Sequence, residues 1–233
     1  MTYDCVVQTI GKAHFVPDKV KENWNKFAPN IKRIVMSDKE CIEFLREEYD
    51  EDYVNKFNYF KKGAHKADLF RYAWLYKRGG VYMDIKTQLI KPFDELFPNK
   101  DICYMFVTGP PFCKIHRIYN GIIATPPSNL LIFDLLKGAM QMTNEKPYIH
   151  NCEEGYAILK SFFKNITTGV NTTNQNIPDV CVRTELNLIN KVPMNLCNKK
   201  DRYGCLTYIV EDNIPIIKIR YHDYPWVRRK CDQ

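Results

Sequence analysis

Five polar residues in the middle of the chain have types and spacings that suit a polar, charged ligand. Asp68 and Arg71 are three residues apart in "HKADLFRYAWLYKRGG", and on a helix such residues lie on the same side. Tyr82, Asp84 and Lys86 alternate along "VYMDIK", and on a strand alternate side chains project from one face. A carboxylate can orient a substrate hydroxyl, and a guanidinium or an ammonium can contact phosphate oxygens. One interpretation of the two stretches is therefore a binding site for a sugar or a phosphate.

Both groups also have a simpler interpretation. Asp68 and Arg71 can be a surface ion pair, worth a few tenths of a kcal/mol, and their spacing alone favours this. Asp84 and Lys86 can neutralise each other at the end of a strand. For that pair the residues alone leave both interpretations open.

The elements expected to position these residues are a helix near residues 64–78 and a strand over 81–86. An apolar stripe on the helix can dock it onto a sheet. Gly79-Gly80 then ends the helix, because glycine readily adopts the left-handed conformation that lets the chain reverse. In open α/β sheets ligands bind at the carboxyl ends of strands, which is where Asp84 stands.

The remaining pattern predicts an α/β protein. Strand, helix, strand and helix alternate over the first 50 residues, which favours a mostly parallel sheet with flanking helices. Ser37 and Glu40 form a capping box at the start of a helix. Strands are expected over 5–10, 31–36, 101–108, 121–125, 205–210 and 214–221, helices over 129–141 (capped by Ser128) and 153–165, and a loop over 165–177. No repeat or linker is visible, so a single domain over residues 1–233 is predicted.

The composition is that of a globular protein, with 45% hydrophobic and 26% charged residues. The net charge of +7 favours an anionic partner such as a nucleoside diphosphate, an acidic glycan, a membrane surface or nucleic acid. The charges are spread along the chain apart from "RYHDYPWVRRK" near its end, so no nucleic-acid partner is predicted. An aromatic content of 13% suits a sugar-facing cleft, although most of these side chains are expected in the core.

Neither a membrane anchor nor a secretion signal is expected from the sequence. No run of about 18 apolar residues indicates a transmembrane helix, and "MTYDCVVQTIGK" lacks the basic and apolar regions of a signal peptide. Nine cysteines with no C-x-x-C pair argue against a disulfide framework and a zinc ribbon, and fit a reducing compartment. The predicted location is cytoplasmic.

The stretch "HKADLFRYAWLYKRGGVYMDIKTQLIKPFDELF" resembles the core motif of glycosyltransferase family 32, the enzymes with a DXD sugar-binding region. The residues that match the family pattern are Ala67, Asp68, Arg71, Tyr72, Leu75, Tyr76, Gly79, Gly80, Tyr82, Asp84 and Pro92. Weaker resemblances are "VVQTI", "YNGIIATPPSNLL" and "YHDYPW", which extend the similarity along the chain. The family includes initiating mannosyltransferases of the Golgi type and, more distantly, large glucosylating bacterial toxins.

This resemblance implies a GT-A-like fold, in which a Rossmann-like sheet binds a UDP- or GDP-sugar. The hexose would pass with retention to a hydroxyl of a glycan, lipid or protein acceptor. Residues 1 to about 100 would form the nucleotide-sugar-binding half, and the rest of the chain to residue 233 the acceptor and closing half. The implied donor-binding residues are Gln8, Thr9, Asp68, Arg71, Tyr82, Asp84 and Asn120. His222 and Trp226 would close over the diphosphate as a lid.

The motif departs from the family pattern at Lys86, where the family has its second Asp, the direct ligand of the metal. Asp84 would remain in the shell of a divalent cation, Mn²⁺ or Mg²⁺, but a protonated lysine cannot ligate one. An ammonium can instead stabilise a leaving diphosphate. Asp84 and Lys86 are therefore the expected catalytic residues, with weak metal dependence. In the competing arrangement, Asp84 holds the cation with Asp223 or His222 while Lys86 turns away.

The predicted function is glycosyl transfer, an enzyme activity of the hexosyltransferase class. The alternative is a catalytically impaired protein that kept a nucleotide-sugar or glycan pocket, with Asp84-Ile85-Lys86 as a degenerate DXD motif. Donor hydrolysis or single-turnover sugar transfer separates the two. A basic nucleic-acid binder ranks far below both, and it predicts a steep salt dependence of binding to oligonucleotides.

Overall fold

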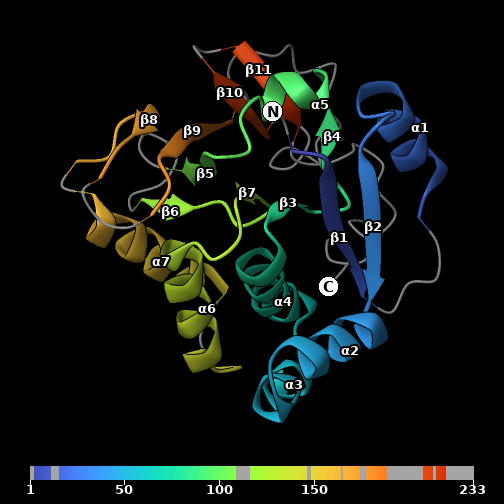
Figure 1. The fold of residues 1–233 in the computed structure, drawn as a ribbon, viewed down its shortest axis with the longest axis vertical. Coiled ribbons are helices and arrows are strands. Elements are labelled where there is room, and N and C mark those ends of the chain that lie inside the picture. Colours follow the sequence, from blue (N-terminus) through green and yellow to red (C-terminus); the bar gives the residue numbers. More distant parts are fainter. Residues whose placement is uncertain are drawn as a thin grey trace.

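Figure 1 shows a computed structural model of the chain, which describes residues 3–11, 16–108, 116–145, 148–163, 165–173, 177–187, 207–211 and 214–218. The described strands belong to one sheet, and helices cover both of its faces. The expected α/β class is therefore confirmed. Within the described residues, none of the helices combines the length and the apolar character that a membrane crossing requires.

The sheet is mixed. Its strands are β1 (Cys5–Gly11), β2 (Lys32–Ser37), β3 (Gly80–Met83), β4 (Gln88–Leu89), β5 (Cys103–Thr108), β6 (Arg117–Ile118), β7 (Ile122–Thr125), β8 (Gly169–Asn171), β9 (Val180–Asn187), β10 (Thr207–Glu211) and β11 (Ile214–Lys218). They are paired in the order β2-β1-β3-β7-β5-β9-β10-β11-β4, with β6 beside β5 and β8 beside β9. The expected parallel pairing holds for β1 with β2, β1 with β3 and β5 with β9, and the other described pairs are antiparallel.

The helices form two groups around this sheet. They are α1 (Asp18–Phe27), α2 (Asp38–Glu48), α3 (Glu51–Tyr59), α4 (Gly63–Arg78), α5 (Phe93–Leu96), α6 (Leu130–Gln141) and α7 (Tyr148–Phe162). In the view of Figure 1, α2, α3, α4 and α6 lie in the lower half and α7 lies at the left, whereas α1 and α5 lie near the top. The first group buries one apolar core against the sheet, with Phe57, Phe70 and Leu135 among its members. The second, smaller core contains Trp24 and Phe93.

Helix starts follow the local sequence in one case and differ from expectation in another. The capping box is confirmed at α2: the Ser37 hydroxyl accepts from the Glu40 backbone N–H, and the Glu40 carboxylate accepts from the Ser37 backbone N–H. The expected cap at Ser128 is wrong, because Asn129 caps α6 through its side chain, which accepts from the Leu131 backbone N–H at 3.0 Å. Ser128 instead has a positive φ of 59° and donates its backbone N–H to the Tyr76 carbonyl.

A helix start and a strand also differ from the sequence prediction. α7 begins at Tyr148, before the expected start at residue 153, and β8 lies within the stretch expected to be a loop. Local composition rich in Asn and Thr suggests a loop. Here the stretch pairs with β9, and such tertiary pairing can override local preference.

The turn between α4 and β3 determines where the helix ends and the strand begins. Gly79 and Gly80 have positive φ angles of 65° and 93°, as the sequence predicts for the end of this helix. A Cβ atom at Gly79 would lie 2.7 Å from the backbone nitrogen of Pro127, so the position needs glycine for space as well as for conformation. The chain thus passes directly from α4 into the middle of the sheet.

β3 is shorter than the predicted strand and ends at Met83 rather than at residue 86. The Asp84 backbone N–H donates to the Gly121 carbonyl at 2.7 Å, and the Thr87 N–H donates to the Asp84 carbonyl at 2.8 Å. Asp84 and Lys86 therefore lie on a turn just beyond the strand. The alternation of a strand extends no farther than Met83, so it does not determine which way Lys86 points.

Candidate functional site

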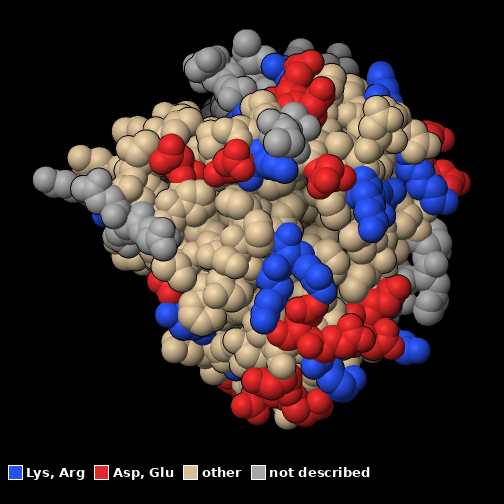
Figure 2. Space-filling model, viewed as in Figure 1, with Lys and Arg blue, Asp and Glu red and all other residues tan. Residues whose placement is uncertain are grey.

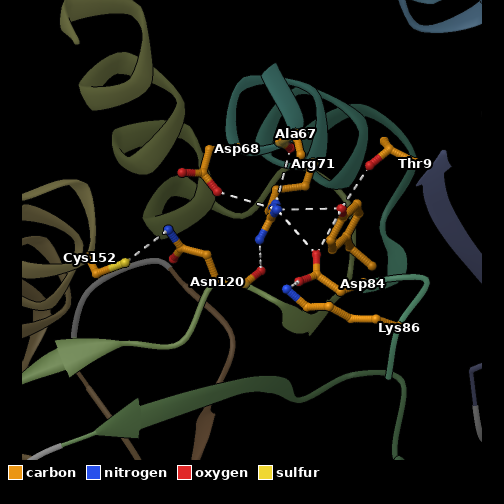
Figure 3. Close-up of polar contacts among 9 residues, drawn as sticks. Thr9, Ala67, Asp68, Arg71, Asp84, Lys86, Asn120 and Cys152 are labelled. Carbon is orange, nitrogen blue, oxygen red and sulfur yellow. Dashed lines mark hydrogen bonds and ion pairs between the residues drawn. The ribbon is translucent and has the colours of Figure 1, made fainter. Parts of the chain in front are cut away.

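Arg71 is the centre of a buried polar cluster, shown in Figure 3. Its side chain, on α4, is 2% exposed. Its Nε donates to the Ala67 carbonyl at 3.1 Å, and one terminal nitrogen donates to the backbone carbonyl of Asn120. The guanidinium carbon lies 4.2 Å from the ring centroid of Tyr82 on β3, a cation–π contact. These contacts hold the guanidinium between the helix, the strand and the segment that precedes β7.

The other terminal nitrogen of Arg71 approaches two carboxylates. It lies 3.4 Å from Oδ1 of Asp68 and 3.4 Å from Oδ1 of Asp84. The Asp68 side chain is 1% exposed and the Asp84 side chain is 20% exposed. The interpretation of Asp68 and Arg71 as a surface ion pair is therefore wrong, because both side chains are buried. Asp68 also shares the Arg71 guanidinium with Asp84.

The Tyr82 hydroxyl links this cluster to β1. It lies 3.0 Å from the Thr9 hydroxyl and donates to Oδ1 of Asp84 at 3.2 Å. Burial raises the pKa of Tyr82, and the positive charge of Arg71 only partly offsets this. The phenol therefore keeps its proton at neutral pH and acts as a donor toward Asp84.

Asp84 joins the buried Arg71 to the more exposed Lys86. The Lys86 ammonium lies 3.2 Å from Oδ2 of Asp84, and the Lys86 side chain is 34% exposed. Burial alone would raise the pKa of Asp84, but Lys86, Arg71 and the hydrogen bonds to the carboxylate together lower it. Asp84 is consequently ionised at neutral pH, with each oxygen facing a cation.

Of the two residues predicted on β1, the structure brings one to the cluster. Val7 is paired with Tyr82, so Thr9, two residues on, lies on the same face of the sheet as Tyr82. Gln8 points to the opposite face, where its side-chain oxygen accepts from Nε of Arg33 at 2.6 Å. Gln8 is thus separated from the cluster by the sheet.

Asn120 contributes a backbone carbonyl to Arg71 and has a side chain of its own at the site. Its Nδ2 lies 3.8 Å from the Cys152 sulfur of α7. Its Oδ1 is buried, with no hydrogen-bond partner among the described residues. A buried acceptor without a partner is available to a water molecule or a ligand hydroxyl.

Tyr72 and Cys152 are site residues that sequence reasoning did not select. The Tyr72 hydroxyl is fully buried near Asp68, and it too has no hydrogen-bond partner among the described residues. Burial, the largest cause, raises the pKa of Tyr72, so the hydroxyl is a proton donor. Its place four residues after Asp68 on one helix was the available signal. For Cys152, no local pattern indicated an approach to Asn120.

His222 and Trp226, the predicted lid residues, lie outside the described ranges, as does Asp223. In Figure 2 a few lysine and arginine side chains lie together near the middle of the view, where Figure 1 draws α4, and acidic side chains lie below them over α2 and α3.

Comparison with known proteins gives a family match over the part of the chain that holds Asp68, Arg71, Tyr82, Asp84 and Lys86. Residues 17–103 match a family described as "Glycosyltransferase sugar-binding region containing DXD motif". An initiation-specific alpha-1,6-mannosyltransferase of Candida albicans is 36% identical over 86 residues, which are 36% of this chain and 22% of the relative. A mannosyl phosphorylinositol ceramide synthase of Saccharomyces cerevisiae is 30% identical over 94 residues, or 39% of this chain and 24% of the relative. The matched segments are therefore less than a quarter of these relatives' lengths.

Two further similarities cover more of the chain at lower identity. An uncharacterized glycosyltransferase of Acanthamoeba polyphaga mimivirus is 22% identical over 188 residues, 80% of this chain and 68% of the relative. Among solved structures, the PaToxG glycosyltransferase covers 69% of each chain with 15% identity and a TM-score of 0.48.

The DXD motif of the matched family implies a divalent cation, and the described residues of this cluster do not fit one. The motif reads Asp84-Ile85-Lys86, so the second carboxylate is replaced by an ammonium. Both oxygens of Asp84 already face positive groups. Within the described ranges, no three His, Cys, Asp or Glu side chains are grouped so that they could hold a metal ion.

Proposed function

We propose, from the match of residues 17–103 to a glycosyltransferase sugar-binding region and from the variant DXD motif within it, that the protein transfers a hexose from a UDP- or GDP-sugar to an acceptor hydroxyl with retention. In this proposal residues 1–233 form one transferase domain. The donor site consists of Thr9, Asp68, Arg71, Tyr82, Asp84 and Asn120, with Lys86 at its exposed edge.

The observation that carries the proposal is the buried arrangement of Arg71 between Asp68 and Asp84. Ionised side chains are expensive to bury, so they are rare in protein interiors unless paired, and they often mark binding sites. Here the pairing is accompanied by two polar atoms, Oδ1 of Asn120 and the Tyr72 hydroxyl, that have no hydrogen-bond partner among the described residues. Carboxylates, an amide oxygen and a phenol suit the several hydroxyl groups of a hexose.

The reaction would exchange one bond for another at the anomeric carbon. The bond from that carbon to the phosphate oxygen breaks, and a bond to the acceptor oxygen forms on the same face of the sugar. The acceptor proton passes to the released nucleoside diphosphate, which leaves with the bonding electron pair. Positive charge aimed at the diphosphate lowers the barrier by stabilising the charge that develops there.

The donor panel can be ordered from the relatives. The curated relatives from Candida albicans and Saccharomyces cerevisiae have mannosyl or mannosyltransferase in their names. Mannose is therefore the first sugar to test, as its GDP and UDP derivatives, followed by glucose and galactose. Glycan, lipid and protein acceptors enter as three separate classes.

The decisive experiment measures hexosyl transfer and donor hydrolysis with purified protein and isotopically labelled sugar nucleotides. We expect release of the nucleoside diphosphate from at least one donor, and Asp84→Asn is expected to abolish it. Saturable donor binding without hydrolysis or transfer to any acceptor class would favour the catalytically impaired alternative. Absence of binding to every donor would contradict the proposal.

The cytoplasmic location stays a prediction, to be tested by fractionation of the source cells.

A further inference from the structure

Lys86 is placed at the proposed donor site in a way that the DXD motif does not anticipate. In Figure 3 its ammonium points toward Asp84, and the two groups are 3.2 Å apart. The turn that carries both residues is held by backbone hydrogen bonds from Asp84 to Gly121 and from Thr87 to Asp84. Lys86 is therefore directed at the cluster by main-chain geometry as well as by charge.

The two cations of the cluster, Arg71 and Lys86, differ in how far their side chains are exposed. The Arg71 side chain is 2% exposed and is committed to Asp68, Asp84 and the Asn120 carbonyl. The Lys86 side chain is 34% exposed. An incoming phosphate can reach Lys86 without displacing buried contacts, whereas reaching the Arg71 guanidinium would require breaking several of them.

The charge balance of the site supports the same assignment. Asp68 and Asp84 bring two negative charges, and Arg71 and Lys86 bring two positive charges, so the four ionised groups sum to zero. With an aspartate at position 86 the sum would be minus two, which is the charge that one divalent cation neutralises. The replacement of that carboxylate by an ammonium therefore makes up the charge that the cation would otherwise supply.

We propose that the Lys86 ammonium takes the place of the divalent cation and binds the diphosphate of the donor, so that donor binding needs no metal. This inference rests on the proposed function. Lysine is an ordinary phosphate partner, and its contact with Asp84 fixes the ammonium at the edge of the site. Asp84 then serves as the anchor of Lys86 rather than as a metal ligand.

The test is the affinity for UDP, GDP and the sugar nucleotides, measured by titration calorimetry in EDTA and again in Mn²⁺. We expect the wild-type affinity to be the same in both. Lys86→Ala should weaken binding by about ten-fold or more, the loss expected for a charge-assisted hydrogen bond. Lys86→Arg, which keeps the positive charge, should retain most of the affinity.

Two further variants make the comparison specific. Lys86→Asp restores the carboxylate pair and should bind weakly in EDTA but recover affinity when Mn²⁺ is added. Lys137→Ala removes an exposed lysine of α6 that pairs with Asp134, and it should bind like the wild type. Thermal unfolding of each variant shows whether it is folded, and the wild-type comparison between EDTA and Mn²⁺ stands even if a variant is not.

The outcomes separate this inference from the function on which it rests. Wild-type binding that appears only with Mn²⁺, or unchanged affinity in folded Lys86→Ala, overturns the role of Lys86 and leaves the transferase proposal standing. Failure of the wild type to bind any nucleoside diphosphate or sugar nucleotide in either condition overturns both.

Discussion

Arg71 is the residue on which most contacts of the site converge. It is buried, and Asp68 and Asp84 both depend on it for their counter-charge. The sequence resemblance assigns it to the donor, and the structure shows that it also holds the protein's own side chains in place. Its two roles predict different consequences when it is removed.

The first prediction concerns Arg71→Ala. We expect a loss of unfolding free energy of about 3–5 kcal/mol, because breaking a buried ion pair leaves uncompensated charge, together with a loss of donor affinity. Denaturant titration and calorimetry measure the two. The control on the same helix is Arg78→Ala, whose pair with Glu48 is more exposed and should cost about 0–1 kcal/mol. Equal effects of the two variants would contradict the importance given to the buried cluster.

The second prediction uses the lowered pKa of Asp84, whose ordinary value is 3.8. A carboxyl whose pKa is lower in the folded state stabilises the fold above its ordinary pKa, and this contribution is lost as the pH falls through the folded value. The difference in unfolding free energy between wild type and Asp84→Asn should therefore be constant near neutral pH. It should shrink as the pH is lowered past 3.8.

Urea titrations of both proteins from neutral to acid pH give this difference directly. The asparagine side chain does not titrate in this range. The decrease of the difference with falling pH therefore comes from the Asp84 carboxyl of the wild type. A difference that stays constant across the acid range, in proteins that remain two-state, would mean that Lys86 and Arg71 do not lower the pKa of Asp84.

At the scale of elements, the passage from α4 to β3 positions three of the proposed donor residues. Asp68 and Arg71 come from the helix, and Tyr82 from the strand that follows the glycine turn. The close approach of Pro127 to Gly79 leaves no room for a side chain there. A change in this turn should therefore affect stability and the site together.

The third prediction compares the two ends of α4. Gly79→Ala should destabilise the protein by about 1–3 kcal/mol or more, since it combines an unfavourable positive φ with a steric contact. It should also weaken donor binding, because an added side chain would displace the turn and shift Tyr82 relative to Arg71. Gly63→Ala, at the first residue of the same helix, is the matched control: its added Cβ has nothing within 4 Å. It should be neutral or stabilising by up to about 1 kcal/mol. Similar stability of both variants would show that the turn tolerates a side chain.

At the scale of the whole molecule, donor binding should raise the melting temperature, because a ligand that binds only the folded state stabilises it by mass action. A donor present at about 100 times its Kd adds roughly 2.7 kcal/mol, which corresponds to a shift of roughly 5–10 °C for a protein of this size. A thermal-shift screen of UDP- and GDP-sugars, with EDTA or Mn²⁺, measures this fourth prediction. Generic oligonucleotides are the control for the net charge of +7. Stabilisation by oligonucleotides that disappears steeply with salt, and none by sugar nucleotides, would favour the nucleic-acid binder instead.

The sequence by itself determined the local elements and the motif of this protein. The helix Gly63–Arg78, its glycine stop and the Ser37–Glu40 capping box were all predicted, because each depends on neighbours a few residues apart. Lys86 was also recognised as the departure from the DXD motif from the sequence alone. Side-chain spacing and backbone preference are local properties, and these features need no more than that.

The tertiary structure alone decided which of these residues meet and how deeply they are buried. The register of β1 with β3 places Thr9 beside Tyr82 and sends Gln8 to the other face. The Asn120 carbonyl reaches Arg71 across 49 positions of the chain. The early end of β3 puts Lys86 on a turn. Strand register, burial and the end of a ladder depend on packing between distant segments, and no pattern of neighbouring residues specifies them.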